Sequence, residues 1–163
     1  MKTTAIIILV LVLAAAPVFG AGSSAISSEK GRDVRLYNQG VALMLDKNFT
    51  AAEGKFRQAL AENSRFSEAH NNLAYVLRKQ GPAHFGEALQ HYNRAIGLKR
   101  YMAQAYMYRG VLFVQMGQPE KARADLATLE GLDASLAREL AYVIDNKREK
   151  EPEQFFGVSK TIQ

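Results

Sequence analysis

The chain has 163 residues, of which 21 are Lys or Arg and 16 are Asp or Glu, so its formal net charge is +5 with neutral histidines. The basic residues are scattered, without a basic run or an alternation of basic and aromatic residues, which argues against a nucleic-acid-binding surface. The chain has no cysteine, which excludes disulfides, thiolate metal sites and lipid attachment at a cysteine.

Residues 1–20 have the pattern of a secretory signal peptide. Lys2 is followed by an apolar run from Ala5 to Ala16 and then by proline and small residues, so we expect cleavage after Gly20, with Ala21 as an alternative end. The apolar run is shorter than the about 20 residues that a membrane-spanning helix needs, although an uncleaved anchor is the alternative. We therefore expect a periplasmic or secreted protein of bacterial origin, with residues 21–32 as a flexible leader rich in Ser, Gly and Ala.

Three copies of one pattern follow, over residues 33–66, 67–102 and 103–134. In the first half of each copy, apolar residues recur at three- and four-residue spacing, which places them on one face of a helix. A small residue lies in the middle of that face, and the second half begins with an alanine followed four positions later by a large residue. The small residues are Gly40, Ala74 and Gly110, and the later pairs are Ala52 and Phe56, Ala88 and Tyr92, and Ala122 and Leu126. Because a minimal side chain lets another helix approach closely, we predict a helix pair in each copy.

The pattern resembles the tetratricopeptide repeat (TPR), which implies an all-α fold in which about three helix pairs stack into a solenoid. One pair alone cannot bury its apolar face, so the stack also needs a cap. The late proline of the family is absent, with Ser64, Arg100 and Ala134 in its place. The second copy is longer between its two helices, and proline and glycine in residues 81–84 predict a loop there.

A capping helix is predicted over residues 135–150, which completes a solenoid of residues 33–150. Asp133 is suited to cap its N-terminus, and Leu136, Leu140, Val143 and Ile144 form one apolar face. Residues 151–163 remain as a C-terminal tail. We expect Phe155 and Phe156 of this tail to dock onto the solenoid or onto a neighbouring copy, because burial of two aromatic side chains stabilises by a few kcal/mol. A frayed, exposed terminus is the alternative.

The sequence carries no motif of catalytic chemistry. There is no glycine-rich phosphate loop and no Gly-x-Ser-x-Gly turn, so we expect neither enzymatic activity nor a cofactor. Asp125 lies near other acidic residues at a helix end, where such residues are expected to be solvated. His70, His84 and His91 lack the spacing of a helical metal site, and we expect no ligand pair and no metal among them, with His84 and His91 solvated.

The resemblance implies that the first helix of each repeat lines a concave groove. The residues predicted to face a partner there are Tyr37, Asn38, Val41, Met44, Asn71, Asn72, Tyr75, Arg78, Gln104, Met107, Tyr108 and Val111. The central repeat supplies polar groups and both flanking repeats are apolar, which suits an extended peptide. Asparagine amides can pair with a peptide backbone, and Arg78 can pair with a carboxylate. Packing of Val41 and Val111 against adjacent helices is the alternative for those two residues.

In the best-known ligand mode of the family, lysines, an arginine and asparagines clamp a C-terminal carboxylate of a chaperone. Asn72 matches that set, but Tyr37, Val41, Gln104 and Tyr108 replace the other clamp residues, so chaperone-tail binding is not predicted.

The sequence thus predicts an exported, non-enzymatic scaffold that binds a polypeptide segment in the groove, in a cell-envelope or secretion assembly. The alternative is a structural protein that self-associates through the ends of the solenoid or through the tail.

Overall fold

The computed structural model describes residues 31–150 and 161–162, and this part of the chain folds into seven α-helices. Their bounds are α2 (Arg32–Leu45), α3 (Phe49–Glu62), α4 (Ser67–Gln80), α5 (Phe85–Leu98), α6 (Ala103–Gln115), α7 (Pro119–Leu132) and α8 (Ala134–Asn146). A short 3₁₀ helix, η1 (Pro82–His84), lies where the longer loop was predicted. Phe155 and Phe156 lie outside the described residues.

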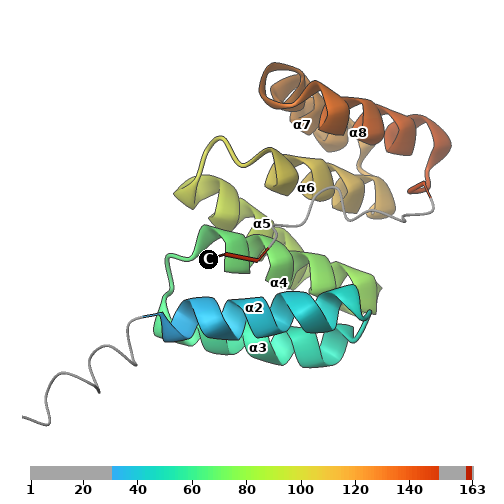
Figure 1. Cartoon of the computed structure of the whole chain (residues 1–163). Coiled ribbons are helices and arrows are strands. Elements are labelled where there is room, and N and C mark those ends of the chain that lie inside the picture. Colours follow the sequence, from blue (N-terminus) through green and yellow to red (C-terminus); the bar gives the residue numbers. More distant parts are fainter. Residues whose placement is uncertain (1–30, 151–160, 163) are drawn as a thin grey trace, which may run out of the picture.

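Consecutive helices pack as pairs that stack on one another. α2 packs on α3, α4 on α5 and α6 on α7, while α3 against α4 and α5 against α6 join one pair to the next. α8 contacts both α6 and α7 and covers the end of the stack (Figure 1). The chain is therefore an all-α solenoid, as the repeat pattern predicts. None of the helices in residues 31–150 has both the length and the apolar character needed to cross a bilayer.

Two glycines lie where another element leaves no room for a side chain. A Cβ atom added at Gly40 would lie 2.6 Å from the ring of Phe56 on α3, and one added at Gly110 would lie 2.5 Å from Leu140 on α8. No larger side chain fits at either distance without movement of the neighbour. The small residues of the sequence pattern are therefore contact points, within a pair at Gly40 and between α6 and the cap at Gly110.

Local signals define several helix ends. The side chain of Asp133 accepts hydrogen bonds from the backbone N–H groups of Ser135 and Leu136, so it caps α8 as predicted. Asn48 caps α3 in a similar way, through the N–H of Ala51. Lys47 adopts a left-handed conformation with φ of 59° and ends α2. These caps satisfy backbone groups that would otherwise lack partners at the helix ends.

Replacement of Gly40 by alanine tests the close approach. We expect Gly40→Ala to lower the free energy of unfolding by roughly 1–3 kcal/mol, because the added methyl group overpacks the contact with Phe56. Gly54→Ala is the matched control, since Gly54 is also helical but has open space around it, and alanine should stabilise there by about 0.5–1 kcal/mol. Urea denaturation of both variants measures the difference. Stabilisation by Gly40→Ala would show that the two helices are not in tight contact.

Candidate functional site

The side of α2, α4 and α6 that carries the predicted binding residues is called the inner face below. All twelve predicted residues are buried except Asn38 and Gln104, which are partly exposed. Most of the residues predicted to face a partner are therefore not exposed, and their contact with a partner stays a prediction. The cause is most evident at α4, which packs against α3, α5 and α6 and is buried at every residue from Ala69 to Arg78.

Polar groups of the inner face bond to one another across helices. Nδ2 of Asn72 donates to the hydroxyl of Tyr37 over 3.1 Å, which links α4 to α2. Nδ2 of Asn71 donates to Oδ1 of Asn72, also over 3.1 Å. On the other side, the rings of Tyr75 and Tyr108 lie 5.0 Å apart and link α4 to α6. The residues predicted as a binding surface thus also hold the repeats together.

Arg78 lies at the centre of the inner face, with a fully buried side chain. Its Nη1 and Nη2 atoms donate to the two carboxylate oxygens of Glu149 over 2.7 and 3.1 Å, and Nη1 also donates to Gln115. The guanidinium stacks over the rings of Tyr75 and Tyr108, with its central carbon 5.4 and 5.0 Å from their centroids. This two-point pairing is the strong form of an arginine–carboxylate contact.

The charges of this pair favour each other's ionised form. Burial alone would raise the pKa of Glu149, but Arg78 outweighs burial and holds the pKa of the carboxyl below its ordinary value. Burial alone would lower the pKa of Arg78, and Tyr92 and Glu149 raise it above its ordinary value. The carboxylate of Glu149 therefore stays charged. Its contact with Arg78 joins the residues that follow α8 to α4.

Asn38 binds the other end of the C-terminal segment. Its Nδ2 donates to the backbone carbonyl of Ile162 over 2.7 Å, and its Oδ1 accepts from the backbone N–H of Ile162 over 2.9 Å. Ile162 also packs against the apolar core, and residues 161–162 lie close to α2 (Figure 1). A carboxamide that binds both main-chain groups of one residue recognises a polypeptide backbone whatever its side chain. The inner face is therefore in contact with this chain's own C-terminal end.

His70 and His91 form a pair that the sequence analysis missed. Their Nδ1 atoms lie 2.8 Å apart and their rings stack at 5.1 Å, across α4 and α5. The carbonyl of Ser64, 3.2 Å from Nε2 of His70, can only accept, so His70 carries its proton on Nε2 and His91 donates from Nδ1. The expectation that His91 is solvated is wrong, because His91 is partly buried against His70, a contact between two helices that spacing within a single helix does not reveal. No group of three or more candidate ligands for a metal occurs in the part of the chain that the structure describes.

Asp125 is also buried, in contrast to the prediction of a solvated carboxylate. It accepts from Nε and Nη2 of Arg109 over 3.0 and 2.5 Å, and Arg109 also donates to Asn93. The contact joins α5, α6 and α7. Asp125 therefore helps to hold the helices together, because it pairs with Arg109 inside the stack.

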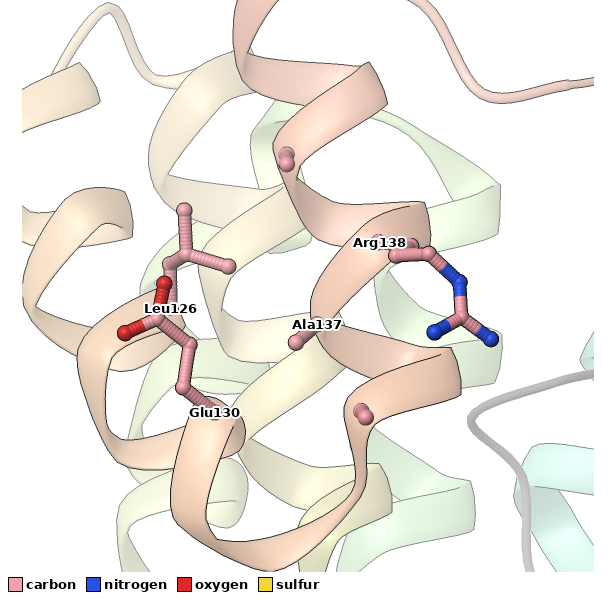
Figure 2. Close-up of a pocket in the computed structure, with 6 residues that line it drawn as sticks. Leu126, Glu130, Ala137 and Arg138 are labelled. Atoms are coloured by element: carbon pink, nitrogen blue, oxygen red, sulfur yellow. The ribbon is translucent and has the colours of Figure 1, made fainter.

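A shallow hollow of about 280 Å³ lies at the end of the solenoid, between α7 and α8. It is lined by Leu126, Glu130, Ala134, Ala137, Arg138 and Ala141. In Figure 2 Leu126 and Glu130 face Ala137 across it, while the side chain of Arg138 points away. Leu126 is only partly buried, unlike Phe56 and Tyr92 at the same position of the other repeats, because no further helix covers it.

The histidine pair makes stability depend on pH. Burial lowers the pKa of both rings, and together with the neighbouring His70 it lowers that of His91 to about 4. Below about pH 6.5 the unfolded chain binds a proton that the folded chain refuses, so the free energy of unfolding should fall as the pH decreases from about 6.5 to about 4. Glu87 and Arg57, which contact or face His91, and Arg94, which faces His70, modulate this effect.

Urea denaturation between pH 7.5 and 4.5 measures this dependence. We expect the free energy of unfolding to depend less steeply on pH in His91→Gln than in wild type. His84→Gln, which removes the histidine outside the pair, should leave the pH dependence unchanged. An equal pH dependence in wild type and His91→Gln would show that the histidine pair does not cause it.

Removal of the carboxylate at Arg78 should destabilise the fold. Glu149→Gln leaves the buried guanidinium without its counter-charge, and we expect a loss of roughly 1–3 kcal/mol, below the about 3–5 kcal/mol typical of fully buried pairs because Glu149 retains 23% side-chain exposure. Glu139→Gln is the control, since its partner Lys150 is 48% exposed and such pairs contribute at most about 1 kcal/mol. Equal losses in the two variants, measured by urea denaturation, would contradict a special role for Glu149.

Solved structures with a similar fold agree with the stacked helix pairs described above. No family model and no curated protein matches the chain. Among solved structures, the Arabidopsis OM64 TPR domain is similar with a TM-score of 0.67 and 17% identity, over 74% of this chain and 99% of that domain. A CopN–Scc3 complex is similar with a TM-score of 0.60 and 18% identity, over 85% of this chain and 82% of the matched chain. The chain therefore has the fold of tetratricopeptide repeat proteins.

Proposed function

We propose that this chain is an exported, non-enzymatic scaffold that binds an extended polypeptide segment on the inner face, as part of a cell-envelope or secretion assembly. The observation that carries the proposal is the contact of Asn38 with both main-chain groups of Ile162. A side chain placed in this way accepts an extended backbone from any polypeptide, and it needs no particular side chain next to it.

Exposure limits where a partner can bind. Arg78 is fully buried against two tyrosine rings and holds this chain's own Glu149 at two points, so it does not meet a partner directly. Gln104, on the partly exposed side of α6, and Asn38 on α2 are the inner-face residues that a partner can reach directly. The similarity to a TPR domain and to a chain from a protein complex agrees with an interaction role. Export is supported by the signal-peptide pattern of residues 1–20.

Site-specific photo-crosslinking in the native host tests this function. A photoreactive residue at Gln104 should crosslink a second polypeptide through a defined segment, whereas one at Arg123, exposed on α7, should not. Asn38→Leu should reduce the yield at Gln104 several-fold, because the backbone contact is lost. The mass of the purified chain should also correspond to a mature N-terminus at Ala21.

Three outcomes would contradict the proposal. Equal crosslinking from both positions would place the partner elsewhere. A second copy of this chain as the sole product would instead favour self-association. A chain that keeps Met1 and stays in the cytoplasm would contradict export.

A further inference from the structure

We propose that the C-terminal end of this chain occupies the position of the partner segment, so that the partner is an extended polypeptide that displaces Ile162 from Asn38. This inference rests on the proposed function and names the chemistry of its partner. The partner presents one residue's N–H and C=O groups to the carboxamide of Asn38 and an aliphatic side chain to the apolar surface that Ile162 contacts.

The contacts at the two ends of the C-terminal segment differ in kind. Glu149 is held at the buried guanidinium of Arg78 by two charge-assisted hydrogen bonds, only three residues beyond the last residue of α8. Ile162 is held by two hydrogen bonds to a partly exposed side chain, and Ile162 is itself only partly buried. The contact at Arg78 is therefore the firm one, and the contact at Asn38 is the one that can exchange.

This arrangement makes the tail a competitor. Because Ile162 belongs to the same chain as Asn38, the two residues meet at a high effective concentration that an external segment has to match. A partner binds only the fraction of molecules in which Ile162 has left, and its apparent affinity is reduced by that fraction. If the bound form of the tail is favoured about tenfold, release of the tail raises the apparent affinity of an external segment by about tenfold.

Backbone recognition also explains why the contact can serve two ligands. Asn38 touches no side-chain atom of Ile162 in either hydrogen bond. A foreign segment therefore satisfies Asn38 as well as Ile162 does, provided that it is extended and can place an apolar side chain beside α2. The inner face does not have to change its own structure when the occupant changes.

The full-length protein and a fluorescent peptide with the sequence of residues 149–163 test the proposal. In the protein, Ile162→Asp places a charge at the apolar contact and releases the tail, while Thr161→Asp makes the same charge change at the exposed neighbouring residue. We expect the peptide to bind Ile162→Asp about tenfold more tightly than wild type, and Thr161→Asp to behave as wild type. Asn38→Leu added to Ile162→Asp should abolish the gain.

The proposal is overturned if the peptide binds wild type and Ile162→Asp equally, or binds neither, or if Asn38→Leu leaves the gain intact. Circular dichroism of each variant shows whether the helices are retained. A wild-type dimer that dissociates on Ile162→Asp substitution would also overturn it, since Ile162 would then bind a second copy. If the peptide experiment fails but a partner is crosslinked at Gln104, competition by the tail is wrong and the proposed function stands. If the peptide exchanges with the tail but no partner is crosslinked, the competition stands and the proposed function is wrong.

Discussion

The inner face depends on one constraint, which is that polar groups shut off from water must be paired inside the molecule. Arg78 is the extreme case, because a buried guanidinium cannot lose its charge and needs a carboxylate beside it. Glu149 supplies that carboxylate from beyond α8. The same requirement links Asn72 to Tyr37 across the first two repeats. Pairing of these groups holds the repeats in register and also brings the chain's end back over the inner face.

The helices could be predicted from the sequence, because the signals that define them are local. Apolar residues at three- and four-residue spacing define each helix, Gly40 and Gly110 mark close contacts between helices, and Asp133 caps the last helix. Each of these signals acts between residues of one helix or of elements that neighbour each other in the stack. The repeat phase then fixes which helix faces which, so the solenoid follows from the pattern without knowledge of any side-chain contact.

The site was predicted less completely, for a physical reason. Arg78 and Glu149 are separated by 71 residues and Asn38 and Ile162 by 124, and no periodicity relates the members of either pair. The repeat register places Asn38 and Arg78 on the inner face, but no local signal identifies the residues that they bind. The pattern of a single helix also suggests one exposed side, whereas α4 has neighbours on several sides and buries Asn71 and Tyr75. The histidine pair was missed because it joins two helices.

Paramagnetic relaxation enhancement measures directly whether Ile162 lies beside Asn38, as the hydrogen bonds between them require. The chain has no cysteine, so Thr161→Cys provides a single, exposed site for a nitroxide spin label. We expect strong broadening of backbone amide signals in α2 around Asn38 and no broadening in α7. Weak, uniform broadening over all helices, or broadening that disappears when labelled protein is diluted with unlabelled copies, would contradict it.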